Sequence, residues 1–186
     1  MKKIVRKAYW NYENEEKWLN EMSAKGLALT DYSWCRYVFA DCTPGEYIYR
    51  IELLKNSSKH LESQKYISFM EENGIEHVAS YMRWVYFRKK ATEGEFDIYS
   101  DIDSKIAHYK RINLLWCFIA GLNLFAGLYN IILMICFMEA NTNYPTCFNI
   151  FCGALSLTLS TLLYFGLIHP NRKKIKKLRY EQKIRE

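Results

Sequence analysis

The sequence lacks the residue patterns by which most catalytic and metal sites are recognised. It has no Cys-x-x-Cys or Cys/His spacing typical of zinc sites, and its four histidines are dispersed. It also has no Ser/His/Asp set, Cys/His pair or phosphate-binding glycine loop. We therefore expect no metal, no cofactor and no catalytic residues, and we interpret the protein as something other than an enzyme.

A disulfide framework is missing too. Cys35 and Cys42 lie in the N-terminal part, and the other four cysteines lie in or beside two apolar segments near the C-terminus. Scattered thiols are typical of a reduced compartment. The start of the chain also lacks the apolar core and cleavage site of a signal peptide. We therefore expect the N-terminal part to be cytoplasmic.

Charge is absent from two long apolar runs, residues 112–138 and 147–168, neither of which contains Asp, Glu, Lys or Arg. As a helix, each run is long enough to cross a hydrocarbon core about 30 Å thick. Soluble helices of this length usually carry charge on an outer face, which argues against two buried helices of a soluble bundle. With only residues 139–146 between them, the runs predict a transmembrane helical hairpin.

The cationic residues predict how this hairpin is oriented. The loop at 139–146 has no Lys or Arg, whereas Lys105, Lys110 and Arg111 precede the first run and a basic tail, 169–186, follows the second. Cationic flanks of membrane helices stay in the cytoplasm. We therefore expect a multi-pass cell-membrane protein with an external loop and with its N- and C-termini in the cytoplasm. The tail should bind the anionic inner leaflet, because each Lys or Arg near it contributes about 1 kcal/mol.

The net charge of +6 does not indicate a nucleic-acid partner. Residues 1–95 contain 15 Lys and Arg against 14 Asp and Glu, whereas the residues after Ile168 contain eight against two. The excess charge therefore belongs to the tail, where membrane topology already explains it. A surface that follows a phosphate backbone would need basic residues on the domain itself, so we expect no direct binding of nucleic acid.

Residues 1–95 are predicted to form an α+β domain made of two similar halves, about 3–40 and 47–89. Each half has the pattern strand, helix, strand, strand. Residues 16–27 align with 64–75 at an offset of 48, and after the loss of one residue 36–39 align with 83–86 at an offset of 47. We expect both helices to cover one face of a sheet. Asn11 or Asn14 is the predicted N-cap of the first helix, and Ser57 or Ser58 that of the second.

This order resembles tandem strand-helix-strand-strand modules of ferredoxin-like or GyrI-like type, which hold small molecules in a cleft between the repeats. Aromatic strand residues with a few charged neighbours would line such a pocket here. Aromatic residues on strands more often form the core than a binding pocket, and Arg50 beside Glu52 is typical of an exposed pair on one face. The candidate residues for binding a ligand or partner are Arg36, Tyr37, Tyr49, Arg50, Glu52, Trp84 and Tyr86.

Residues 96–111 are predicted to form a helical connector that continues into the first run and couples the domain to the membrane. Within the runs, small and polar residues recur at helical spacing, which predicts faces that pack on each other or on a second copy. The runs contain no charge, which argues against a transport pathway. The candidate packing residues are Asn123, Gly127, Asn130, Gly153, Ser156 and Ser160.

Four segments together resemble a bacterial protein family, domain of unknown function twenty-eight-twelve. They are EEKWLNEMSAKG, PGEYIYRIEL, RWVYFRKK and EFDIYSDIDSKIAHYKR, and they cover roughly residues 5–111. Members of that family similarly carry a C-terminal membrane hairpin and are often encoded beside PadR-like transcriptional regulators. The resemblance implies a bacterial membrane protein linked to regulated expression, and it implies no catalytic residue.

Two functional hypotheses follow. The first is a membrane-anchored cytoplasmic sensor or regulator that binds a small molecule or a partner protein, with a PadR-like regulator or a second copy of the chain as candidate partners. The second is a structural or accessory subunit of a larger membrane assembly, such as an exporter.

Overall fold

A computed structural model describes residues 2–99, 101–139 and 146–185 of the chain. The chain divides into two compact units, Met1–Asp101 and Ile102–Glu186, which we call the α+β unit and the helical unit. Most of the predicted external loop, residues 140–145, lies outside the described residues.

The α+β unit contains two successive halves with the predicted order of strand, helix, strand, strand. The first half consists of β1 (Lys2–Arg6), α1 (Tyr12–Ala24), β2 (Leu27–Ser33) and β3 (Arg36–Asp41). The second consists of β4 (Tyr47–Leu53), α2 (Leu61–Glu72), β5 (Glu76–Tyr81) and β6 (Trp84–Lys90), followed by a 3-10 turn, Ala91–Glu93.

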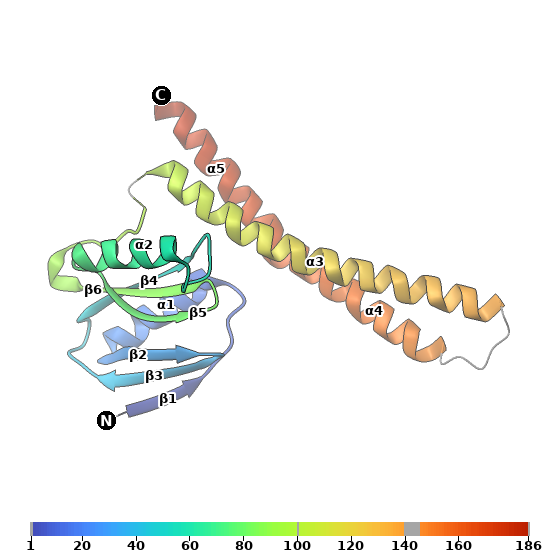
Figure 1. Ribbon diagram of the computed structural model, residues 1–186, viewed down its shortest axis with the longest axis horizontal. Coiled ribbons are helices and arrows are strands. Elements are labelled where there is room, and N and C mark those ends of the chain that lie inside the picture. Colours follow the sequence, from blue (N-terminus) through green and yellow to red (C-terminus); the bar gives the residue numbers. More distant parts are fainter. Residues whose placement is uncertain (1, 100, 140–145, 186) are drawn as a thin grey trace. The chain divides into compact units, whose positions relative to one another are not determined.

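Each half forms its own antiparallel sheet, with strand orders β1-β3-β2 and β4-β6-β5. The expectation that both helices cover one sheet face is wrong. Leu19 and Met22 of α1 pack in a core with Phe39 of the first sheet and Tyr49 of the second, so α1 contacts both sheets and lies beside the edge strand β4. In contrast, α2 packs on the other face of the second sheet, around Phe87. The first sheet therefore faces both α1 and the second sheet, and α2 covers the far side of the second sheet (Figure 1).

The two halves correspond at a constant offset of 48 from helix to last strand. Each second strand has a bulge, after Leu29 in β2 and after His77 in β5. Each hairpin then turns over two residues, because Ser33 pairs with Arg36 as Tyr81 pairs with Trp84. The predicted offset of 47 for the last strand is therefore wrong. Residues 36–39 and 83–86 share the pattern Arg-aromatic-Val-aromatic, which suggested that they occupy equivalent positions. An alignment shifted by one residue would assign every side chain of β6 to the opposite face of its sheet.

Different residues cap the two helices. Asn11, one of the two predicted candidates, caps α1 by accepting the Glu13 N–H at 2.9 Å. The cap of α2 is His60, whose Nδ1 accepts the Glu62 N–H at 3.3 Å, and not Ser57 or Ser58. The chain makes a further turn before the helix, in which the His60 N–H donates to the Ser57 carbonyl at 2.9 Å.

The helical unit consists of two long antiparallel segments. The first, α3 (Ile102–Glu139), begins inside the predicted connector, 96–111, and runs without a break through the first apolar run. Residues 96–99 are not helical, so the helical part of the connector is shorter than predicted. The second consists of α4 (Thr146–Leu163), a π-helical turn (Tyr164–Ile168) and α5 (His169–Arg185). Pro170 explains the wide turn, because it has no N–H to donate and its ring would clash with the carbonyl of Gly166 in a regular α-helix.

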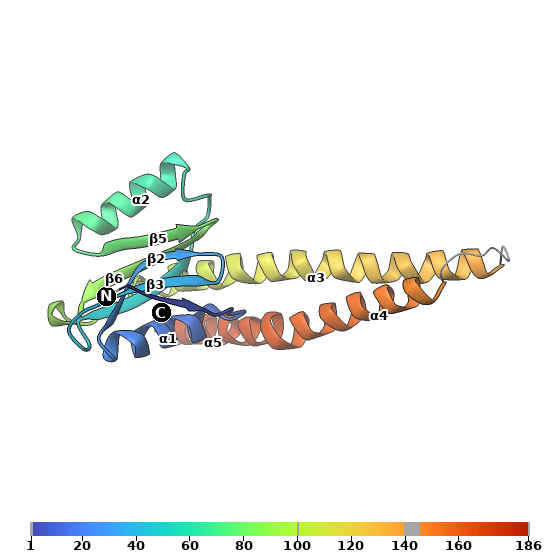
Figure 2. The ribbon, with the colours of Figure 1, turned by 90° about the horizontal axis from the view of Figure 1, so that it is seen from below.

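The predicted small and polar faces of the two apolar runs pack on each other. Gly127 and Gly153 lie against each other across α3 and α4, and a Cβ at Gly153 would lie 3.4 Å from the Gly127 carbonyl oxygen. The Ser160 hydroxyl donates to the Ala120 carbonyl across the interface at 3.0 Å. Asn123 and Asn130 donate instead to carbonyls of α3 itself, and Ser156 is half-buried. Figure 2 shows α3 running beside α4 and α5.

Each long segment contains a stretch that is apolar and long enough to cross a membrane. Their outward faces expose large apolar side chains, including Phe118, Phe125 and Phe151. Contiguous apolar surface of this kind marks a membrane or protein contact. Beyond the apolar runs, α5 continues along α3, where Gln182 donates to Asp103 at 3.2 Å and the Lys174 ammonium lies 5.6 Å from the Tyr109 ring centroid.

Replacing Gly127 by Leu should weaken the packing of α3 on α4, because a Cβ at this position would lie 2.8 Å from the Leu157 side chain. Overpacking typically costs about 1–3 kcal/mol. We expect a lower thermal unfolding midpoint for the detergent-solubilised chain. Gly121→Leu is the matched control, since nothing lies within 4 Å of a Cβ there. An equal loss in both variants would contradict this packing.

Candidate functional site

A buried carboxylate joins the two sheets of the α+β unit. Glu15, in the first turn of α1, is only 7% exposed. Its Oε1 accepts hydrogen bonds from the hydroxyl of Tyr37 at 2.7 Å and from that of Tyr86 at 2.7 Å. Because Tyr37 belongs to β3 and Tyr86 to β6, this one oxygen connects α1 to both sheets. We call Glu15, Tyr37 and Tyr86 the Glu15 junction.

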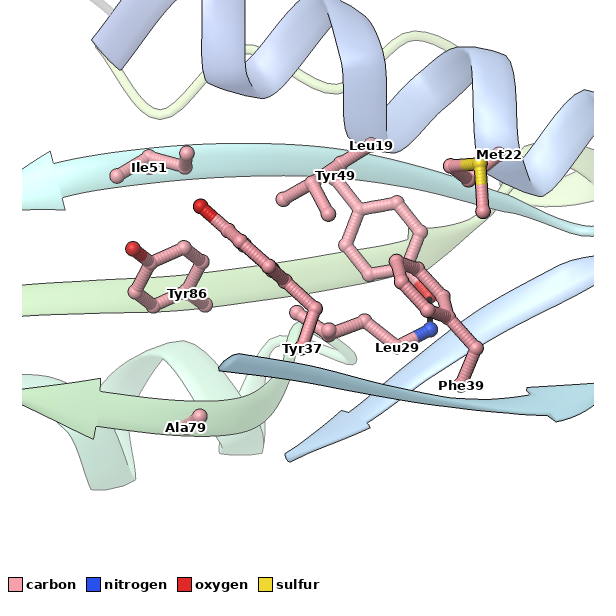
Figure 3. Packing of buried hydrophobic residues seen from close by; sticks show 9 residues of the cluster. All are labelled: Leu19, Met22, Leu29, Tyr37, Phe39, Tyr49, Ile51, Ala79 and Tyr86. Atoms are coloured by element: carbon pink, nitrogen blue, oxygen red, sulfur yellow. Dashed lines mark hydrogen bonds between the residues drawn. The ribbon is translucent and has the colours of Figure 1, made fainter. Parts of the chain in front are cut away.

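The side chains around the junction form a closed apolar core. Tyr37 and Tyr86 lie among Leu19, Leu29 and Ile51, and their hydroxyls turn to the same side (Figure 3). The two tyrosines are 1% and 2% exposed. Unpaired buried polar groups are costly, so a core of this kind requires the carboxylate and the two hydroxyls to satisfy one another.

The junction perturbs the ionisation of its own members. Burial raises the pKa of Glu15 above its ordinary value of 4.5, and the two tyrosine hydrogen bonds oppose this shift. Burial, and next the charge of Glu15, raises the pKa of Tyr37 and Tyr86. Both phenols therefore remain protonated donors, and Glu15 is the member whose ionisation changes first as the pH rises.

Tyr32 of β2 extends the junction towards the surface. Its ring centroid lies 4.7 Å from that of Tyr37 and 4.6 Å from that of Tyr86, and the residue is half-buried. Burial is also the main cause that raises the pKa of Tyr32. The cluster can hold a proton on Glu15 within the core, but its tight packing gives a substrate no access to the carboxylate.

A second set of α1 side chains covers the edge of β4. Glu16, Asn20 and Ser23 lie on one stripe of the helix and contact the outward peptide groups of alternate residues on β4. Glu16 Oε2 accepts the Ile51 N–H at 3.0 Å. Asn20 accepts the Tyr49 N–H at 2.8 Å and donates to the Tyr49 carbonyl at 3.2 Å. The Ser23 hydroxyl accepts the Tyr47 N–H at 3.2 Å and donates to the Tyr47 carbonyl at 2.6 Å. This helix therefore protects an exposed sheet edge.

The sequence analysis missed Glu15, Glu16, Asn20 and Ser23. Their signal was present, because polar residues at positions 16, 20 and 23 share one stripe of a helix, next to the stripe of Leu19 and Met22. A polar stripe is normally assigned to solvent, and nothing in the pattern indicated a strand edge beside it.

The aromatic candidates come together, mostly as core. Tyr37, Tyr49 and Tyr86 are at most 2% exposed. The Tyr49 hydroxyl accepts the Leu29 N–H at 2.8 Å, so it too is engaged inside the unit. Trp84 is half-buried and its ring centroid lies 5.9 Å from that of Tyr12.

The charged candidates do not form one cluster. Arg50 lies 3.4 Å from Glu16 and over the ring of Phe96, whereas Glu52 is buried and accepts the Tyr66 hydroxyl at 2.7 Å. The two are thus not the exposed pair that their alternation suggested. Arg36 lies in the first sheet and forms a more exposed ion pair with Asp31 at 3.6 Å. Pairs of this kind contribute little to stability.

Large apolar side chains gather at one end of the α+β unit, which we call the tip surface: Trp10, Trp34 and Met82. They are 65%, 74% and 71% exposed. Trp34 and Met82 occupy the β2–β3 and β5–β6 turns, which lie at the same end in both views (Figures 1 and 2). The rings of Trp34 and Tyr81 are 6.0 Å apart and link the turns.

Backbone strain sets Met82 apart from an ordinary turn residue. Its φ of 55° lies in the left-handed region, which a bulky side chain adopts at a cost and which turns usually fill with Gly or Asn. Strained backbone concentrates at functional positions. The exposed Met82 in this conformation therefore makes the tip surface a candidate functional surface.

Metal binding finds no support in the described ranges, 2–99, 101–139 and 146–185, where no three His, Cys, Asp or Glu side chains come together in a way that could hold an ion. All six cysteines are free thiols.

Comparison with known proteins places the chain in a family. The family described as Protein of unknown function (DUF2812) matches residues 11–121. The chain belongs to this family. The resemblance found in the sequence segments is thereby confirmed. The DUF2812 match contains α1, both Glu15 partners, the turns of the tip surface and the first part of α3. No curated protein and no solved structure matches the chain.

Glu15→Gln should change how the stability of this DUF2812 protein depends on pH. Because the folded-state pKa of Glu15 is raised above 4.5, the protonated form stabilises the fold. This contribution is complete below pH 4.5 and is lost as the pH rises through the raised pKa. Glutamine has no such proton to lose. We expect the free energy of unfolding of the wild type, relative to Glu15→Gln, to fall as the pH is raised towards neutrality.

The measurement is denaturant unfolding of the full chain in detergent across this pH range. Glu21→Gln, an exposed position on the same helix, is the matched control and should follow the wild type. A difference between Glu15→Gln and the wild type that stays constant with pH would show that the Glu15 junction does not perturb this carboxyl.

Proposed function

We propose that this DUF2812 protein is a membrane-anchored regulatory protein whose cytoplasmic α+β unit binds a partner protein through the tip surface. The family resemblance nominates a PadR-like transcriptional regulator as that partner. The observation that carries the proposal is the tip surface itself. Trp and Met are enriched at the centres of protein interfaces, and three such residues exposed together on one small unit favour a docking site.

The anchor consists of the apolar runs of α3 and α4. The exposed phenylalanines of both helices support their insertion in lipid. The distribution of cations supports a multi-pass orientation with both termini in the cytoplasm. In this orientation Lys105, Lys110 and Arg111 lie near the anionic inner leaflet, together with the first cations of α5.

A protein partner is better supported than a small molecule between the repeats. In a GyrI-like arrangement the ligand would lie in a cleft between the two halves. In this unit Tyr37, Tyr49 and Tyr86 fill the space between the sheets and bond to other core groups. We therefore propose that a GyrI-like tandem repeat serves here as a rigid scaffold and presents its binding residues at the turns.

The coupling element is α3. It continues from the predicted connector into the first apolar run with no interrupting loop or proline. A continuous helix is stiff, so a partner that moves the first turns of α3 would also move its apolar part. This supports a regulatory role in which binding and the membrane segment influence each other.

A second candidate function is an accessory subunit of a larger membrane assembly, such as an exporter. The outward apolar faces of α3 and α4 favour it, because they fit a neighbouring membrane helix as well as they fit lipid. Native mass analysis of the solubilised protein separates the two: co-purifying membrane subunits favour the assembly.

Topology is tested by thiol labelling. Cys147 is exposed in the first turn of α4 and should lie at the external face. We expect an impermeant maleimide to label Cys147 in intact cells and to leave Cys35 and Cys42 unlabelled until the cells are broken. Cys147→Ser identifies the labelled site. Labelling of Cys35 or Cys42 in intact cells would reverse the proposed orientation.

Partner binding is tested by affinity purification of the full chain from detergent extracts. We expect Trp34→Ser with Met82→Ser to lose a partner that the wild type retains, since both side chains lie at the centre of the tip surface. Phe69→Ser is the matched control, because it removes an exposed aromatic residue of α2 away from these turns. Retention of every wild-type partner by the tip variant would exclude the tip surface as the binding site.

A further inference from the structure

The two halves of the α+β unit are joined by contacts between a helix and a strand edge, which we call the joint. A helix and a strand edge at the corresponding positions of the repeat are exposed. In the joint, the α1 stripe Glu16, Asn20 and Ser23 bonds to the outward peptide groups of β4. β4 is an edge strand of its sheet. The joint is thus a helix of one half laid against the first strand of the next half.

The counterpart of β4 in the first half is β1, also an edge strand. Ile4 pairs with Val38 in the first sheet, and Ile51 pairs with Tyr86 in the second. Val38 and Tyr86 occupy the same position in the two halves, at the offset of 48. Ile4 of β1 is therefore the counterpart of Ile51. The Lys7 N–H donates to Cys35 in the β3 hairpin, so the alternate residues Lys2, Ile4 and Arg6 turn their peptide groups outward. Ile4 is 56% exposed.

The counterpart of the α1 stripe lies on α2. The offset of 48 places Gln64, Ser68 and Glu71 at the positions of Glu16, Asn20 and Ser23. All three are exposed, and Leu61, one turn before Gln64 on the same stripe, is 67% exposed. The Gln64 amide donates to the Ser58 carbonyl, which leaves its Oε1 as an acceptor like that of Glu16, and the Ser68 hydroxyl can both donate and accept.

Charge makes these two surfaces complementary. Residues 2–7 carry Lys2, Lys3, Arg6 and Lys7 and no acidic residue, whereas α2 carries Glu62, Glu71 and Glu72 against Lys65. The first strands correspond at an offset of 47, so Lys2 and Ile4 take the places of Tyr49 and Ile51, opposite Ser68 and Gln64. The place of Tyr47 lies outside the described residues, so two of the three contacts of the joint can be repeated. Glu71 lies one turn beyond Ser68 on the side of Lys2, and Leu61 and Glu62 lie on the side of Arg6. Two copies of α2, or two copies of β1, would instead place like charges together.

We propose that α2 of one protein molecule binds the β1 edge of a second copy of this chain, repeating the internal joint between molecules. The contact is head to tail, so each copy keeps one free β1 and one free α2. An interface of this type forms a ring if the rotation closes and a chain if it does not. Stacking of repeats through one recurring interface is the principle of solenoid proteins.

Charge reversal on each side tests the proposal. Lys2→Glu with Arg6→Glu makes an acidic β1, and Glu62→Lys with Glu71→Lys makes a basic α2. We expect each double variant of the full chain, in detergent, to associate at least about tenfold more weakly than the wild type, because each opposes like charges. A mixture of the two variants should recover association, since both of its mixed contacts again join opposite charges. Lys25→Glu with Lys55→Glu is the control for net charge and should associate like the wild type.

Cross-linking then identifies which surfaces meet. The Ile51–Glu16 contact of the joint predicts that Ile4→Cys on one copy reacts with Gln64→Cys on another through a short bismaleimide, whereas two copies of Ile4→Cys do not react with each other. A wild type that stays monomeric up to its solubility limit would overturn the proposal. So would double variants that associate as strongly as the wild type, or a mixture that recovers nothing.

Discussion

The α+β unit depends on one buried carboxyl group that is shared by three elements. Glu15 stands at the start of α1, and a hydroxyl from each sheet donates to its Oε1. A charge in this position is costly on its own, and each hydroxyl would be costly without the carboxylate. The three groups therefore fix the position of α1 against both sheets. The α1 stripe that covers β4 can form only when the helix is held there.

The Glu15 junction also makes the two halves different. The counterpart of Glu15 in α2 is Ser63, which is equally buried. α1 contacts both sheets and meets a hydroxyl donor from each, whereas α2 covers a single sheet. A carboxylate suits the first position and a small hydroxyl the second. The same repeat pattern thus yields an inner helix that joins layers and an outer helix whose second stripe stays exposed.

The sequence predicted the elements better than their arrangement. Periodicity placed α1, α2 and all six strands, and capping placed the start of α1 at Asn11, because each of these signals is local. Two sheets instead of one, and the side of each sheet that meets a helix, depend on pairings between distant residues. The residue types of β6 even indicated the wrong register. Of the candidate site, the tyrosines were found through their alternation on strands, but their acceptor Glu15 was not, since an acidic residue in a first helical turn is ordinarily explained by the helix dipole. The membrane orientation and the partner stay predictions.

The most direct test of the account is a double-mutant cycle on the Glu15 junction, with Tyr37→Phe, Tyr86→Phe and the combined variant unfolded by denaturant. Phenylalanine keeps each ring and removes only the donor. If both hydroxyls serve one oxygen, the loss of the first changes the contribution of the second, and the free energies of unfolding should differ from additivity by roughly 0.5–3 kcal/mol. Strict additivity would mean that the hydroxyls act independently and that Glu15 does not join the two sheets.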